Sequence, residues 1–266
     1  MTPTSRLPGR FHGPTYCTLR GQTDQRAIEG MLLLTQQYRV AEWALPLSGA
    51  TLQSERQRQE LVQAIGWLCA PLSDQGNALR ANVCLQLDLQ ATQMLLDGQM
   101  DLCGIVGKPG AQVQRVQICP PLGLTDAQER RMATILRAWP DITFIAPGSA
   151  LSLWVRMYAY ENRAMFFSHP VGADLRPMSD MRGFSGSLSP ESLERELPWA
   201  HAAVDGHPYW IDLGSQAFDL QGRFHFGMAR LVLRTVGQFM DCVSEALQRH
   251  APATVRAEQS AATVVS

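Results

Sequence analysis

Short apolar runs alternate with amphipathic segments along most of this chain. Runs of about four to eight apolar residues bounded by Gly, Pro or Ser are typical of buried strands, whereas apolar residues at every third or fourth position are typical of helices. On this basis strands are predicted at residues 16–19, 40–47, 79–85, 113–119, 142–146, 164–168, 181–185 and 209–213. Helices are predicted from about residue 24, at 55–69, 90–96, 125–139 and 150–160, from residue 189, and at 226–248.

Local signals support two of the predicted helix starts. Thr125 is followed three residues later by Gln128, a capping-box pattern in which each side chain bonds to the other residue's backbone N–H. Ser189, Pro190 and Glu191 combine an N-cap serine, a proline at the first helical position and an acid in the first turn. The regular alternation of strand and helix favours a single α/β domain, a (β/α)8 TIM barrel, over a doubly wound open sheet.

Length and composition agree with one packed domain. The chain has 266 residues, of which 45% are hydrophobic and 18% charged. Single α/β barrels have a similar length of about 250 residues. Neither end of the chain has a periodic pattern, so we expect residues 1–12 to be a flexible N-terminal segment, 13–250 the barrel, and 251–266 a disordered tail.

Charge and cysteine spacing exclude several classes of function. The net charge of −1, from 23 basic and 24 acidic residues, argues against nucleic acid as a partner. No apolar run approaches the ~18 residues of a membrane span, and no signal peptide is predicted. The six cysteines form no C-x-x-C pair, which predicts a reduced, cytoplasmic protein without a metal site. The absence of a G-x-G-x-x-G motif predicts no dinucleotide cofactor. The oligomeric state cannot be predicted.

The last third of the chain carries two recognisable motifs. Residues 183–193 read Gly-Phe-Ser-Gly-Ser-Leu-Ser-Pro-Glu-Ser-Leu, and residues 209–215 read Tyr-Trp-Ile-Asp-Leu-Gly-Ser. They resemble the seventh and eighth β/α units of the phosphoribosylanthranilate isomerase family, and residues 16–24 are weakly similar to its first strand and loop. The resemblance covers about residues 16–248. It implies a divergent barrel that binds a phosphorylated sugar or nucleotide-like small molecule.

The same loops predict an anion site on physical grounds. Backbone N–H groups at a glycine-rich turn and at a helix N-terminus bind anions, and barrels often hold a ligand phosphate after strands seven and eight. Gly183, Gly186 and Ser187 would form one side of this site, and Gly214 and Ser215 the other. The alternative is that these glycines only permit tight turns.

Four other polar residues are expected to contribute to the same ligand site. Arg20 and Arg182 flank the predicted mouth of the barrel, and the arginine fork suits phosphate or carboxylate groups. Asn82 and Gln117 interrupt the predicted strands three and four, which are otherwise largely apolar.

Two candidates for acid–base chemistry come from the resemblance. Cys17 lies where the resembled family has a catalytic cysteine that acts as a base; a thiolate could abstract a proton, but a cysteine in a strand also fits simple packing. The family's general acid is an aspartate at the end of strand six, where this chain has Ser168 and His169. His169 would replace that acid, or Asp174 would reach in from the loop; alternatively, the His-Pro pair forms only a turn.

Glu42 and Asp212 are candidates from physics alone. Each interrupts a strand that is expected to be covered on both faces, and a buried carboxylate costs several kcal/mol unless it is paired or hydrogen-bonded. They belong either to a catalytic site or to a structural pair with an arginine such as Arg20, Arg80 or Arg182.

Three functional hypotheses follow. The first is a metal-independent isomerase or lyase that uses Cys17, Glu42, His169 and Asp212 as acids and bases. The second is an inactive barrel that senses or sequesters a phosphorylated ligand, which the missing strand-six aspartate favours. The third is a scaffold that acts through protein contacts.

Overall fold

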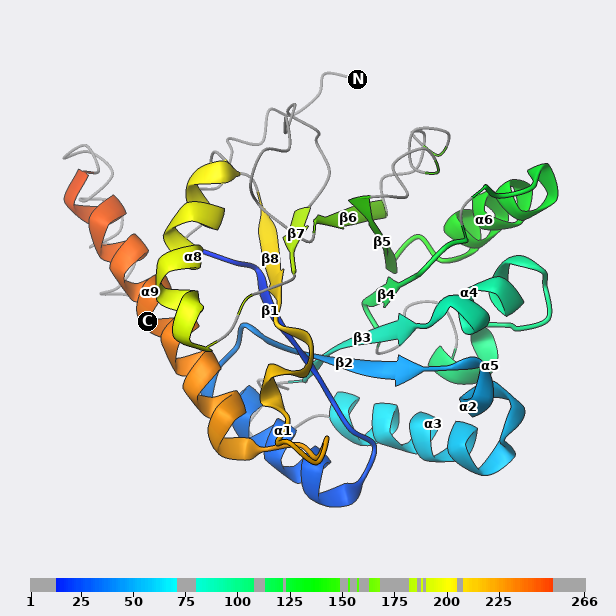
Figure 1. Cartoon of the computed structure of the whole chain (residues 1–266), viewed down its shortest axis with the longest axis horizontal. Coiled ribbons are helices and arrows are strands. Elements are labelled where there is room, and N and C mark those ends of the chain that lie inside the picture. Colours follow the sequence, from blue (N-terminus) through cyan, green and yellow to red (C-terminus); the bar gives the residue numbers. More distant parts are fainter. Residues whose placement is uncertain are drawn as a thin grey trace, which may run out of the picture.

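The chain folds into a closed barrel of eight parallel strands, in the order β1 to β8 (Figure 1). The computed structural model describes residues 13–70, 80–107, 113–121, 123–148, 153, 157, 163–167, 182–185, 188, 190–204 and 208–250. The strands are β1 (Tyr16–Arg20), β2 (Ala41–Leu47), β3 (Asn82–Leu87), β4 (Arg115–Gln117), β5 (Thr143–Pro147), β6 (Arg163–Phe167), β7 (Arg182–Phe184) and β8 (Tyr209–Asp212). Pairing of β8 with β1 closes the sheet, which confirms the expected TIM barrel and excludes the open sheet.

Helices surround the barrel on its outside (Figure 1). They are α1 (Gln25–Gln37), α2 (Gly49–Gln53), α3 (Glu55–Cys69), α4 (Leu89–Leu96), α5 (Cys103–Val106), α6 (Asp126–Ala138), α8 (Pro190–Ala203) and α9 (Phe226–His250), with a 3-10 turn, η2 (Gly214–Ala217), after β8. None of the described helices is long and apolar enough to cross a membrane.

Most of the predicted elements are confirmed, and the exceptions are local. The capping box of Thr125 and Gln128 opens α6 as expected, and α3 has the predicted bounds. The prediction for β3 began three residues too early and ended two residues too early; at its end, the half-buried Gln86 continues the strand while interrupting its apolar run. The short helix α2, which is capped by Ser48, was missed. The predicted ends, 1–12 and 251–266, and most of the predicted helix 150–160 lie outside the described residues.

Each strand separates two cores. Residues facing the helices form the larger one, which includes Leu19, Trp43 and Phe144. Residues facing the barrel axis form a smaller one of Ala44, Cys84, Ile145, Ala164 and Trp210. Successive side chains along a strand point to opposite faces, so Thr18, Glu42, Arg115 and Asp212 lie on the inner face. These polar side chains therefore project into the barrel.

Candidate functional site

A buried ion pair occupies the barrel interior. Arg115 Nη1 of β4 donates to Glu42 Oε2 of β2 over 2.8 Å, and the two side chains are 3% and 0% exposed. Thr18 Oγ1 of β1 donates to the same carboxylate oxygen over 2.6 Å. Removing both charges from water is costly, and the close contact together with the second hydrogen bond offsets part of that cost. Burial raises the pKa of Glu42, while Arg115 and Thr18 oppose the shift.

Two aromatic rings hold the Arg115 guanidinium. Its central carbon lies 4.2 Å from the centre of the Trp210 ring and 4.8 Å from that of Tyr16, within the range of cation–π attraction. Gly183 of β7 makes room for the indole, since a Cβ atom there would lie 2.1 Å from Trp210 Cε2. The glycine that the sequence suggested for an anion loop thus has a packing reason to be a glycine.

Some atoms of this cluster have no hydrogen-bond partner among the residues that the structure describes. Glu42 Oε1 and Arg115 Nε and Nη2 are buried and unpaired. Unpaired buried donors and acceptors of this kind are a feature of functional sites as well as of sites for ordered water.

Asp212 adds a second carboxylate on the inner face. It lies at the end of β8, opposite Thr18 in the strand register, and is 8% exposed. The N–H of Gly214 donates to its Oδ1 over 2.9 Å. Burial raises the pKa of Asp212 to about 6, and the nearby charge of Glu42 acts in the same direction against Gly214 and Arg115. A carboxyl group that titrates near neutral pH is suited to accept or donate a proton.

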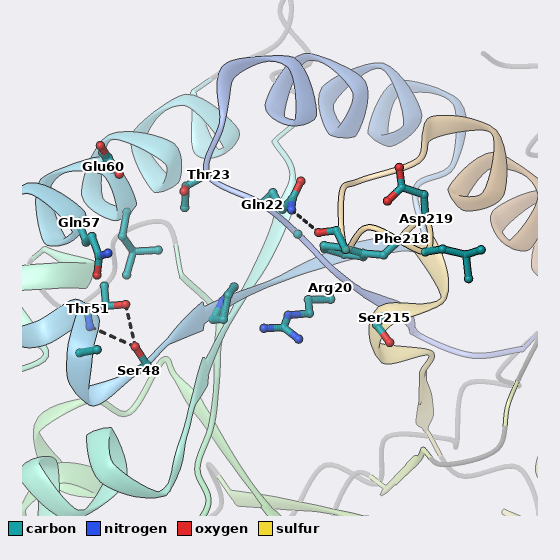
Figure 2. A pocket seen from close by; sticks show the side chains of 16 residues that line it. Arg20, Gln22, Thr23, Ser48, Thr51, Gln57, Glu60, Ser215, Phe218 and Asp219 are labelled. Atoms are coloured by element: carbon teal, nitrogen blue, oxygen red, sulfur yellow. Dashed lines mark hydrogen bonds between the residues drawn. The ribbon is translucent and has the colours of Figure 1, made fainter.

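A pocket opens at the carboxyl ends of β1 and β2 and beside the loop after β8 (Figure 2). It has a volume of ≈ 810 Å³ and is lined mainly by polar side chains. Arg20, the last residue of β1, lies between the Ser48 and Thr51 side chains of one wall and Ser215 and Phe218 of the other. Ligand pockets have volumes of about 300–1,000 Å³, so this one can hold a molecule much larger than an inorganic ion.

Among the described residues, no carboxylate is paired with Arg20. Its guanidinium carbon lies 6.0 Å from the centre of the Phe218 ring, and Arg20 forms no ion pair with any described residue. The two acids of the pocket wall are already paired: Glu60 with Arg56 and Asp219 with Arg223. The described lining of the pocket therefore combines the cation of Arg20 with neutral hydroxyl and amide groups and with two carboxylates that are paired to arginines outside the lining.

The structure places Cys17 away from this mouth. Cys17 is fully buried in the core between strands and helices, on the face of β1 opposite to Thr18. Burial raises the pKa of its thiol well above the ordinary value, and the charges of Asp212 and Glu42 add to the shift. A protonated thiol that faces the helices does not support the base role that the resemblance implied.

The other predicted site residues have mixed placements. Gln117 is 9% exposed at the carboxyl end of β4, beside Gln86, and so lies toward the mouth. Asn82 lies at the amino end of β3, where its side chain donates to the Ala41 carbonyl over 3.1 Å. Ser215 lines the pocket, whereas the Gly214 N–H is taken by Asp212.

The remaining candidates are not tested by the structure. His169, Asp174, Gly186 and Ser187 lie outside the described residues. Arg182 belongs to β7, but its side chain is likewise not described. Among the described residues, no three His, Cys, Asp or Glu side chains are grouped as metal ligands.

Sequence reasoning missed Arg115 as the partner of Glu42. The arginines suggested for such a pair were Arg20, Arg80 and Arg182. Arg115 and Gln117 alternate with the buried Val116, and this alternation of polar residues in a short strand was the available signal.

Comparison with solved structures gives the same fold. The chain superposes on N-(5'-phosphoribosyl)anthranilate isomerase from Pyrococcus furiosus with a TM-score of 0.52 and 13% identity, over 84% of this chain and 99% of that one. For monomers of the dimeric phosphoribosylanthranilate isomerase from Thermotoga maritima the TM-score is 0.50 and the identity 10%, over 84% and 98%. No protein-family model and no curated protein sequence matches the chain. The chain is thus structurally similar to phosphoribosylanthranilate isomerases, and at this identity the similarity establishes the fold alone.

Proposed function

We propose that this barrel binds a phosphorylated sugar or nucleotide-like small molecule at the carboxyl ends of its strands, with Arg20 as the anion-binding residue. The observation that carries the proposal is the guanidinium of Arg20, which has no ion-pair partner in the described part of the chain, in a pocket of ≈ 810 Å³. Ligands of barrel proteins bind at this end of the strands. The similar solved structures are of enzymes whose name includes a phosphoribosyl group, which supports the same class of ligand.

The lining of the pocket favours a ligand with hydroxyl groups as well as an anionic group. Ser48, Thr51 and Gln57 form one wall, and Ser215 lies on the other (Figure 2). Hydroxyl and amide groups pair well with a sugar, and the space is larger than phosphate alone needs. A bidentate arginine contact would hold the phosphate.

Thermal-shift measurements with sugar phosphates, phosphoribosyl compounds and mononucleotides test this proposal. A ligand present at one hundred times its Kd stabilises the folded state by about 2.7 kcal/mol. We expect Arg20→Ala to abolish the shift and Arg26→Ala, an exposed arginine of α1 outside the pocket, to retain it. The unphosphorylated sugars and nucleosides serve as ligand controls. A shift that is the same in Arg20→Ala, or no shift with any phosphorylated compound, would contradict the proposal.

A second candidate function is catalysis by a metal-independent isomerase or lyase. The specific observation for it is Asp212, an inward carboxyl group with its pKa raised to about 6. General acid–base catalysis is most effective near such a pKa. Against it stands the outward placement of Cys17, which favours a protein that binds without reaction. Turnover of any bound ligand that is lost in Asp212→Asn, with binding retained, would decide for the enzyme.

A further inference from the structure

The first and last loops of the barrel are joined by one side chain. Gln22, two residues beyond the end of β1, donates from Nε2 to the Gly222 carbonyl over 2.8 Å. Its Oε1 accepts from the Phe224 N–H over 2.9 Å. The partners lie 200 and 202 positions further along the chain, so these two hydrogen bonds form only when the barrel is closed.

The segment that Gln22 holds is a preformed hairpin of residues 218–224. Phe218 and Phe224 form an antiparallel bridge at its base. Inside the turn, Asp219 Oδ1 accepts from the N–H groups of Gln221 and Arg223, each over 2.9 Å. Gly222 adopts a φ of +72°, a conformation in which glycine is favoured. Since the turn is fixed internally, a contact at one point positions the whole hairpin.

The hairpin has two anchors on the rest of the protein. Phe224 packs edge-on against Trp43 with ring centres 5.8 Å apart, and it lies so close to α1 that a Cβ atom on Gly30 would be 3.0 Å from its ring. Among the described residues, Gln22 is the one side chain from outside the hairpin that hydrogen-bonds to it. The base is therefore held by the packing of Phe224 and by its hydrogen bond to Gln22, and the turn by the second Gln22 hydrogen bond, to Gly222.

This arrangement bears directly on Arg20. Phe218, at the start of the hairpin, forms the pocket wall beside the Arg20 guanidinium (Figure 2). A long exposed side chain loses rotamer entropy when it is ordered, and a fixed aromatic neighbour reduces what remains to be lost on binding. We propose that Gln22 is a positioning residue for the pocket. Its two hydrogen bonds hold the hairpin so that Phe218 stays beside Arg20, and Phe218 in turn orders the Arg20 side chain for anion binding. This inference rests on the proposed function.

Calorimetric titration with ribose 5-phosphate tests the role of Gln22. We expect Gln22→Ala to weaken binding by about three- to tenfold, whereas Gln25→Ala, in which a nearby glutamine that contacts Glu29 is removed, leaves it unchanged. Hydrogen exchange of the amides at 219–224 should be faster in Gln22→Ala than in the unmodified protein. A melting temperature for each variant separates these effects from general loss of stability.

A double-mutant cycle with Phe218→Leu asks whether Gln22 acts through Phe218. If it does, the double variant binds ribose 5-phosphate about as weakly as the single variant with the lower affinity, because the two substitutions disrupt the same interaction. Losses that multiply, or Gln22→Ala that binds like the unmodified protein, would overturn the role of Gln22 while leaving the proposed function intact. Failure of the unmodified protein to bind any phosphorylated compound would instead overturn both.

Discussion

Two arginines in this barrel lie beside aromatic rings, and they differ in whether a carboxylate neutralises their charge. Arg115, inside the barrel, contacts Trp210 and Tyr16 and is paired with Glu42. Arg20, at the mouth, lies beside Phe218 and has no carboxylate partner among the described residues. An arginine that is ion-paired within the fold stabilises the structure, whereas an exposed arginine without such a partner can bind an external anion. Arg115 therefore belongs to the supporting interior and Arg20 to the proposed binding surface.

The largest expected effect is that of Arg115→Met. This change leaves Glu42 buried without its counter-ion, which costs about 3–5 kcal/mol in comparable pairs. Replacing both partners, as in Glu42→Leu with Arg115→Met, should recover most of the stability, because no buried charge then remains. Urea unfolding of the two variants and the unmodified protein measures this. A loss below about 1 kcal/mol in Arg115→Met would show that the pair is not structural.

The next effect concerns the pH dependence of stability. The pKa of Asp212 is raised to about 6, so its contribution to stability is complete below pH ~4 and is lost as the pH rises through 6. The difference between the ordinary pKa of an aspartate and about 6 corresponds to about 3 kcal/mol. We expect Asp212→Asn to match the unmodified protein at pH 4 and to be more stable than it at pH 7–8. Equal stability of the two proteins across this pH range would mean that the Asp212 pKa is not raised.

The packing around Arg115 gives a third, somewhat smaller effect. Gly183→Ala places a methyl group 2.1 Å from the Trp210 ring, and overpacking of this kind costs about 1–3 kcal/mol. Gly66→Ala, on α3 with nothing within 4 Å, is the matched control and should be neutral or stabilising. Thermal unfolding compares the two. If Gly183→Ala is tolerated as well as the control, Trp210 is not fixed by this glycine.

The sequence predicted the barrel better than its interior. The bounds of α3 and the cap of α6 follow from local periodicity and local hydrogen bonds, which a sequence displays directly. The face of Cys17 was not predicted, because both faces of a barrel strand are buried and the alternation of Cys17 and Leu19 with Thr18 and Arg20 is short. The pairing of Glu42 with Arg115 depends on the closure and register of strands that are 73 residues apart in the chain. The position of Arg20 at the barrel mouth was predicted because Arg20 directly follows a predicted strand, which is local information in the sequence.

The smallest expected change in stability is that of Arg20→Ala, and it completes the comparison. Exposed side chains without a structural partner usually change stability by no more than about 0.5 kcal/mol when replaced. Arg20→Ala should therefore unfold at nearly the same urea concentration as the unmodified protein, in contrast to Arg115→Met. If Arg20→Ala also loses its response to ribose 5-phosphate, binding and stability reside in different arginines. A loss of more than about 2 kcal/mol would instead assign Arg20 a structural role, and the pocket would then lack a free cation among the residues described for its lining.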